Sequence, residues 1–277
     1  MVAARLVVVT GGKGGPGATT LAAGLAGAWA AAGRRVLLVD LDPAGGDVAA
    51  HLPVGELRRR GVAALLGSGR VTPRTVLAEA VEVLAGGGLR VLVGLPRPDG
   101  AGLLGPAVAV AVAEAARQAG GVDVVVVDAG RLLPGSVAQA LLGVPRAVGV
   151  LAARADVPGA LAAQRALLAA GEATAGGLVV VAVGVRRRRS ADVAELAEAL
   201  AQPVGGVVPA RRRQLGRAVQ RGRPPTRGPL GRAYRTLAAA LDPADGGEPT
   251  RRARRGRHAR RWGRGSLGPG EREATSA

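Results

Sequence analysis

Short runs of valine and leucine alternate along most of this chain with longer segments rich in alanine and leucine. Runs such as Val124–Val127 are apolar at every position, which is typical of parallel strands buried on both faces of a sheet. The alternation predicts a doubly wound α/β domain, with a mostly parallel sheet and helices on both faces. The expected strands are 5–10, 35–40, 89–94, 123–128, 147–151, 178–185 and 205–209. The expected helices are 18–32, 73–84, 103–118, 134–142, 157–170, 190–201, 211–220 and 229–241, and the segment 53–88 is the least regular.

The composition limits both the core and the chemistry. The chain has 277 residues with no Cys, Phe, Ile or Asn, so Val, Leu and Ala must build most of the core. The lack of cysteine excludes disulfides, a thiol nucleophile and a thiolate metal site. With two histidines, a His-based zinc site or a Ser-His-Asp triad is not expected. The N-terminus has no signal-peptide pattern, so we expect a cytoplasmic protein, with association to the nucleoid or the membrane left open.

Positive charge is concentrated in the last third of the chain. Residues 1–185 hold 16 Lys and Arg against 12 Asp and Glu, whereas residues 186–277 hold 22 Arg against 8 acidic residues. After Leu241 the alternation stops, and a Pro/Gly-rich linker leads into an Arg/Gly-rich segment that cannot supply a core. We therefore expect one folded domain over residues 1–242 and a disordered basic tail over residues 243–277.

The glycine-rich segment after the first expected strand carries the most specific chemical signal. It nearly matches the phosphate-binding pattern G-x-x-x-x-G-K-[ST] between Gly12 and Thr19. Glycines let backbone N–H groups converge on a phosphate at the start of the next helix, and Thr19 stands where a hydroxyl binds Mg²⁺. Ala18 replaces the usual lysine. The chain's only lysine, Lys13, lies within this loop, where a compact ammonium suits a phosphate group.

Three carboxylates stand at the ends of two expected strands. Asp40 and Asp42 are two residues apart, a spacing that points both side chains to one side of an extended chain. Asp128 ends the run 123–128, the arrangement in which a carboxylate supports Mg²⁺ beside a nucleotide. Ligands lie beyond the carboxyl ends of such strands, so we expect these acids to face the loop. Each signal alone also fits an ordinary turn, but their order along the chain is specific.

These motifs resemble those of the MinD/ParA ATPases. Gly12–Thr20 looks like their deviant Walker A motif K-G-G-x-G-K-[ST]-[ST], Val39–Pro43 is similar to their second motif, and Val127 with Asp128 is similar to Walker B. Gly222–Pro224, together with the preceding strand, resembles their late strand-turn-helix segment. The resemblance covers about residues 4–242 and implies the same fold, binding of ATP and Mg²⁺, and a homodimer in the ATP state.

The resemblance also implies roles for individual residues. Lys13 would reach across the ATP-bound dimer to the partner's phosphates, and Asp42 would orient the attacking water. Thr19, Asp40 and Asp128 would support the metal. The phosphate cradle would consist of Gly12, Lys13, Gly14, Gly15, Gly17, Ala18, Thr19 and Thr20.

Two departures weaken parts of this resemblance. Ala18 removes the lysine that contacts phosphate within the same chain, at a cost on the order of 1.5–3 kcal/mol in binding and more in catalysis. The family often recognises adenine with an Asn, and here Arg186 and Arg187 follow the corresponding strand. In the CpaE/TadZ and septum-site-determining branch of the family, a small residue often stands at this place, and the loop of this chain resembles that branch. Those proteins usually carry a receiver-like domain before the loop, which here begins ten residues in.

We therefore expect an ATP-binding, dimerising positional switch with weak or absent hydrolysis, acting in pilus assembly, septum placement or partitioning. An active ParA-like ATPase that cycles on non-specific DNA, and a nucleotide-free scaffold, stay open as alternatives. The late arginines and the basic tail would bind DNA or an anionic membrane, or would only form a solvated surface. A protein partner is expected but not identified. These late arginines are Arg186–Arg189, Arg211–Arg213, Arg217, Arg221 and Arg223.

Overall fold

The computed structural model describes residues 3–15, 17–52, 54, 61–84, 88–96, 102–171, 177–186 and 190–242. In this part the chain forms one sheet in the order β3-β4-β2-β5-β1-β6-β7-β8. Its strands are β1 (Arg5–Gly11), β2 (Val36–Asp40), β3 (Val81–Leu84), β4 (Leu89–Leu92), β5 (Val124–Arg131), β6 (Val148–Arg154), β7 (Leu178–Val185) and β8 (Val204–Pro209). The helices are α1 (Ala18–Ala31), α2 (Val48–His51), α3 (Val62–Ser68), α4 (Pro73–Glu79), α5 (Pro106–Arg117), α6 (Val137–Leu142), α7 (Val157–Ala170), α8 (Ser190–Ala199), α9 (Arg212–Gln220) and α10 (Gly228–Leu241).

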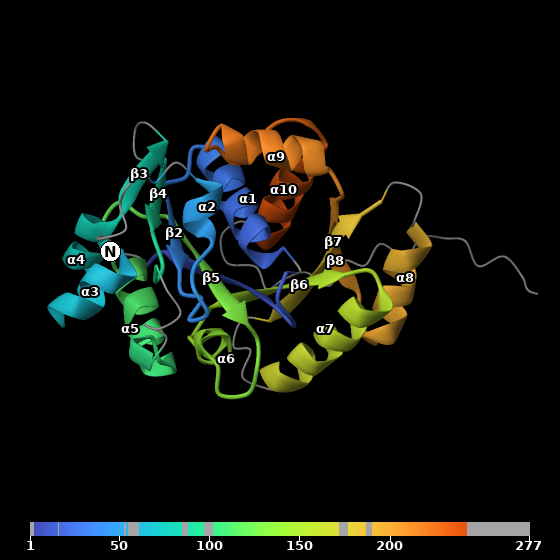
Figure 1. Ribbon diagram of the computed structural model, residues 1–277, viewed down its shortest axis with the longest axis horizontal. Helices are drawn as coiled ribbons and strands as arrows, with labels where there is room; N and C mark the ends of the chain where they lie inside the picture. Colours follow the sequence, from blue (N-terminus) through green and yellow to red (C-terminus); the bar gives the residue numbers. More distant parts are fainter. Residues whose placement is uncertain are drawn as a thin grey trace, which may run out of the picture. The chain divides into compact units, whose positions relative to one another are not determined.

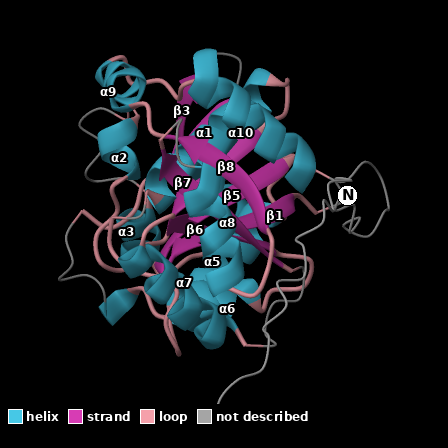
Figure 2. Cartoon of the chain, turned by 90° about the vertical axis from the view of Figure 1, so that its right-hand side faces the viewer, coloured by secondary structure: helices cyan, strands magenta, loops and turns pink. Residues whose placement is uncertain are grey.

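Helices cover both faces of this sheet (Figures 1 and 2). The strand pairs are parallel, except that β3 runs antiparallel to β4 at one edge. One core lies between the sheet and α1, α2 and α10, and the second between the sheet and the helices α3 to α8. The prediction of a doubly wound, mostly parallel α/β domain is therefore confirmed.

The valine runs occupy the centre of the sheet, as their uniform apolarity predicts. Val124–Val127 of β5 are fully buried, and β5 pairs with β1 on one side and with β2 on the other. The chain crosses from β1 to β2 on one side and later returns to β6 on the other. A crevice therefore forms at the carboxyl end of β1, where such sheets place their ligands.

Helix α1 packs unusually closely on its neighbours because two of its residues are glycines. A Cβ at Gly24 would collide with the ring of Tyr234 in α10, and one at Gly27 would collide with Pro224. Residues 17–33 carry no charged side chain, and most of them belong to this buried helix. Among the described residues no helix combines the length and apolarity that crossing a membrane requires.

The expected helix 73–84 is wrong in its second half. Helix α4 stops at Glu79, and Val81–Leu84 forms the edge strand β3. Two β-branched valines alternate with other residues here, and antiparallel pairing with β4 satisfies backbone groups that a longer helix would have satisfied locally. The short helices α2 and α3 were not expected either. The predicted disordered tail, residues 243–277, lies outside the described residues.

Candidate nucleotide-binding site

The glycine-rich loop lies between the end of β1 and the start of α1. Gly15 and Gly17 adopt φ angles of 75° and 92°, a region that favours glycine, and Gly17 is the N-cap of α1. The sheet register places Asp128 beside Val9 on one side and beside Asp40 on the other. The structure thus brings the loop and the strand-end acids to one edge of the sheet, which is the arrangement expected from the sequence.

Asp128 is buried, with 1% of its surface exposed, and neither carboxylate oxygen has a hydrogen-bond partner. Burial raises the pKa of Asp128 to about 6. The nearby Thr19 hydroxyl and Gly130 N–H oppose this shift, but neither reaches hydrogen-bonding geometry. A buried carboxylate with both oxygens unsatisfied is costly, and a bound cation or its water shell would satisfy it. The donor set therefore fits a hard divalent cation.

Asp40 is fully buried, and both of its oxygens are used. Oδ2 accepts a hydrogen bond from the Val48 N–H at 3.1 Å, and Oδ1 accepts one from the Asp42 N–H at 3.3 Å. Burial, followed by repulsion from Asp128, holds the pKa of Asp40 well above its usual range. A Cβ at Gly94 would lie 2.7 Å from the Asp40 carboxyl carbon. Asp40 fixes the turn that leads into α2, and its contribution to a metal site stays a prediction.

Asp42 is half-buried at the same edge. Its Oδ1 accepts a hydrogen bond from the Ala44 N–H at 2.9 Å, and burial raises its pKa. A Cβ at Gly130, whose φ is 67°, would lie 2.5 Å from Asp42 Oδ1. The carboxylate of Asp42 is therefore packed over the end of β5, within the same crevice as Asp128.

Three contacts of the loop could not be expected from its motif. A Cβ at Gly12 would collide with the Ala162 carbonyl of α7, so that position requires glycine. The buried Thr10 hydroxyl donates to the Gly130 carbonyl at 2.8 Å. His51 Nδ1 lies 2.9 Å from the Asp47 carbonyl, which can only accept. In the neutral ring Nε2 therefore accepts from the Thr20 hydroxyl at 3.2 Å.

Three cationic side chains flank the loop. Lys13, within it, lies near Asp156 and contributes to lowering the pKa of that carboxyl, whose main cause is the hydrogen bond from Arg154. Arg154 itself is engaged with Asp156 at 2.8 Å. Arg131, at the end of β5, pairs in register with Gly11, and its side chain lies against Gly14. The sequence signal for Arg131 was only its place three residues after Asp128.

A cavity of about 210 Å³ opens beside the loop. It lies between Gly15 and Gly17 on one side and the ends of β7 and β8 on the other. Leu21, Leu215 and Tyr234 contribute apolar walls, and Arg186, which follows β7 directly, also lines it. The cavity thus has apolar walls of the kind that a flat heterocyclic base requires, and none of the described residues that line it supplies a side-chain amide.

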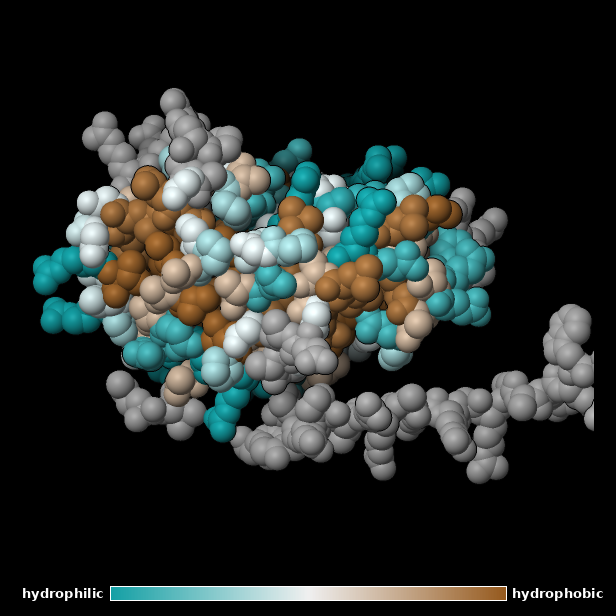
Figure 3. Space-filling model, turned by 90° about the horizontal axis from the view of Figure 1, so that it is seen from below, coloured by the Kyte–Doolittle hydropathy of each residue, from teal (hydrophilic) through white to brown (hydrophobic). Residues whose placement is uncertain are grey.

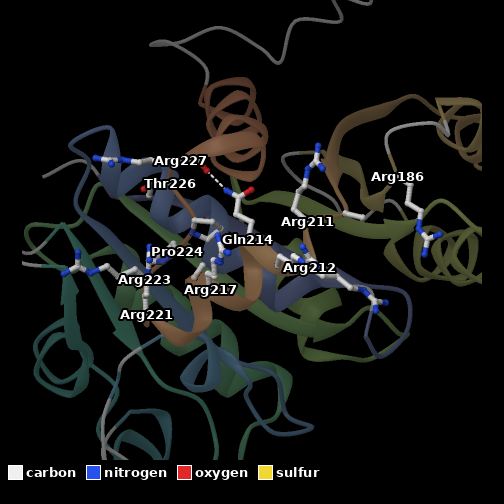
Figure 4. A pocket seen from close by; sticks show the side chains of 14 residues that line it. Arg186, Arg211, Arg212, Gln214, Arg217, Arg221, Arg223, Pro224, Thr226 and Arg227 are labelled. Atoms are coloured by element: carbon white, nitrogen blue, oxygen red, sulfur yellow. Dashed lines mark hydrogen bonds between the residues drawn. The ribbon is translucent and has the colours of Figure 1, made fainter.

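A larger hollow of about 1040 Å³ is lined by arginines (Figure 4). Its guanidinium groups come mainly from α9 and from the segment between α9 and α10, and no residue of α9 is buried. Of the late arginines singled out in the sequence, 187–189 lie outside the described residues. The lining arginines are Arg186, Arg211, Arg212, Arg213, Arg217, Arg221, Arg223 and Arg227.

The described residues contain no cluster of three or more His, Cys, Asp or Glu side chains placed to hold a metal ion. Asp128 and the Thr19 hydroxyl would therefore supply only part of a ligand set, which suits Mg²⁺ because that ion usually completes its shell with water and substrate phosphates. A glycine loop at a helix N-terminus beside such acids defines a P-loop nucleotide-binding protein.

The model of the CobQ/CobB/MinD/ParA nucleotide-binding domain family matches residues 7–225, and the chain belongs to this family. No curated protein matches the chain by sequence.

Solved structures share the fold at low sequence identity. A ParA family ATPase from Chlorobium tepidum is 16% identical, with a TM-score of 0.72 over 87% of this chain and 100% of its own. The septum site-determining protein MinD of Pyrococcus horikoshii, complexed with Mg-ADP, is 18% identical, with a TM-score of 0.70 over 87% and 96%. Cobyrinic acid a,c-diamide synthase of Mycobacterium smegmatis, with bound ADP and magnesium, is 23% identical, with a TM-score of 0.63 over 86% and 94%.

Proposed function

We propose that this protein is an ATP-binding switch that dimerises in the ATP state and hydrolyses ATP slowly or not at all. The observation that carries the proposal is the unsatisfied, buried carboxylate of Asp128 beside Thr19 at the start of α1. An unpaired buried carboxylate destabilises the fold, so this arrangement is not expected in a protein that has lost the ability to bind nucleotide.

In this proposal the loop from Gly12 to Thr20 holds the phosphates through its backbone N–H groups. Thr19 and Asp128 would hold Mg²⁺, with Asp40 behind them, and the ion when bound would neutralise phosphate charge. Asp42 would orient a water molecule in the crevice. Ala18 supports slow hydrolysis, because charge that develops on the phosphates lacks the cation usually found there.

The surface next to the loop supports the proposed homodimer. Helix α7 begins beside Lys13 and exposes large apolar side chains: Val157 is 75% exposed, Leu161 49% and Leu168 82%. Figure 3 shows apolar areas on the face of the molecule that lies below the sheet in Figure 1. The exposed apolar side chains of α7 would be covered by a second copy of the chain, whose phosphates Lys13 would then reach.

The arginine-lined hollow favours a second candidate, an ATPase of the partitioning type that cycles on DNA. A concave surface with this many guanidinium groups is suited to binding phosphates without reading bases. The small residue at position 18 instead supports the switch and the CpaE/TadZ-like branch, with a role in pilus assembly or septum placement. The nucleotide-free scaffold is the third alternative.

The test is light scattering of the purified protein with Mg-ATP and Mg-ADP, together with phosphate release at near-physiological salt. We expect a dimer with ATP, a monomer with ADP, and a monomer in both for Lys13→Ala. Phosphate release should not exceed that of Asp42→Ala. Arg74→Ala, an exposed arginine on α4 away from the loop, is the control and should behave like the wild type.

Two results would replace the switch with an alternative. Turnover that DNA or anionic liposomes stimulate, and that both variants abolish, would establish the cycling ATPase. The absence of ATP binding in the wild-type protein would favour the third alternative, the nucleotide-free scaffold.

A further inference from the structure

Arg131 lies where a phosphate-binding cation would be needed in a loop that lacks its lysine. It follows Asp128, Ala129 and Gly130 at the end of β5, and it pairs in register with Gly11, the last residue of β1. The Leu132 N–H also donates to the Gly11 carbonyl at 3.0 Å. These backbone contacts fix the base of the Arg131 side chain one strand away from the start of the loop.

The guanidinium of Arg131 reaches the middle of the loop. A Cβ at Gly14 would lie 2.8 Å from Arg131 Nη2, so the guanidinium is in contact with the backbone of Gly14. Arg131 is also close enough to Asp42 to oppose the rise in the pKa of that carboxyl. The guanidinium therefore lies against the phosphate loop, with the carboxylate of Asp42 in its neighbourhood.

Arg131 is available for a ligand, unlike its neighbour Arg154. It is an exposed residue, and no ion pair among the described residues involves it. Arg154 forms an ion pair with Asp156. Lys13 is expected to contact the phosphates of the second protomer in the ATP-bound dimer. Of the three cations Lys13, Arg131 and Arg154, Arg131 is thus the one that is free to bind an anion within the same chain.

Resting on the proposed function, we infer that Arg131 replaces the missing loop lysine and binds the phosphates of ATP within the same chain. A guanidinium presents several N–H donors in a planar fork and makes charge-assisted hydrogen bonds to phosphate oxygens. It starts from β5 rather than from α1, so it approaches the loop from the side of Gly14. In this inference, Ala18 leaves the start of α1 without a cation, and Arg131 supplies one from the end of β5.

The test measures Mg-ATP affinity by calorimetry for the full chain and its variants. Arg131→Ala should weaken binding about ten- to hundredfold, as expected for one charge-assisted contact. Arg131→Lys should retain part of the affinity, and Arg74→Ala, the control on α4, should bind like the wild type. The unfolding midpoint without nucleotide should stay unchanged in all three. Should Arg131→Ala fold poorly, Arg131→Gln keeps the length of the side chain and removes its charge.

A double-mutant cycle gives the sharpest outcome. Ala18→Lys restores a cation at the usual place, so Arg131→Ala in that background should cost much less affinity than it does alone. Equal affinity of the wild type and both neutral variants at Arg131 would overturn this inference and leave the proposed function intact. Equal losses in the two backgrounds would show that Arg131 does not substitute for the lysine. A wild-type chain that binds no ATP would overturn the proposed function and the inference together.

Discussion

Asp40 and Asp128 lie side by side at the ends of β2 and β5, and burial raises the pKa of both carboxyls. An acid whose pKa is higher in the folded state binds its proton more tightly there than in the unfolded chain. The nucleotide-free protein should therefore lose stability as the pH rises from about 4, the pKa of an unfolded aspartate, through about 6, the pKa of folded Asp128. Binding of a cation would reverse this loss.

The substitution Asp128→Asn tests this dependence of stability on the charge of the carboxylate. The amide carries no charge, so without metal or nucleotide we expect the variant to be more stable than the wild type at pH 7, by an amount on the order of 2 kcal/mol. The difference should vanish near pH 4. Urea unfolding in a chelator across this pH range measures it.

Asp123, next to the other end of β5, gives a control of opposite sign. The ion pair with Arg35 at 2.6 Å lowers the pKa of Asp123, so Asp123→Asn should lose a little stability at pH 7 and none at low pH. An Asp128→Asn variant that is less stable than the wild type at every pH would contradict the interpretation of Asp128 as an uncompensated buried acid.

At the scale of elements, α1 is the helix that carries the phosphate loop, and its position depends on Gly24. A Cβ there would collide with the ring of Tyr234, which is almost fully buried in α10. Alanine favours helices over glycine by about 1 kcal/mol, but a collision in a packed core costs typically 1–3 kcal/mol. We expect Gly24→Ala to lower the free energy of unfolding, as measured by urea denaturation.

Gly67 of α3 is the matched control, because a Cβ there meets nothing within 4 Å. Gly67→Ala should stabilise the protein by up to about 1 kcal/mol. If the two substitutions changed stability in the same direction, close packing of α1 on α10 would not be what Gly24 provides.

The elements also show what the sequence could predict and why. Uniform valine runs and strand-end acids predicted the central strands and the meeting of Asp128 with the loop, because both follow from local pattern and the direction of parallel strands. The edge strand β3 was missed because its four residues pair only across the sheet. The contact of Arg131 with Gly14 depends on β1 lying next to β5, and the hydrogen bond between His51 and Thr20 depends on the turn after β2. Neither contact can be predicted from the spacing of residues along the chain.

At the scale of the whole molecule, α10 completes the core on its face of the sheet. Leu237, Ala238 and Leu241 are buried there, and Leu237 packs directly on Gly206 of β8. Asp242 follows them and pairs with Arg34 at 3.6 Å. The composition beyond this point is Arg- and Gly-rich and lacks the apolar residues of a core. We therefore propose that residues 1–242 contain everything needed for folding and for ATP-dependent dimerisation.

A chain cut after Asp242 should unfold cooperatively at the same urea midpoint as the full chain, and should still dimerise with Mg-ATP in light scattering. A chain cut after Thr236 loses three buried apolar side chains. At about 1.5–3 kcal/mol for each buried leucine, it should lose at least 3 kcal/mol of stability, a large part of what a domain of this kind has. The two cuts differ by six residues, so their contrast locates the end of the domain. A marked loss of stability after the first cut would mean that residues beyond Asp242 contribute to the fold, and the proposed boundary would be wrong.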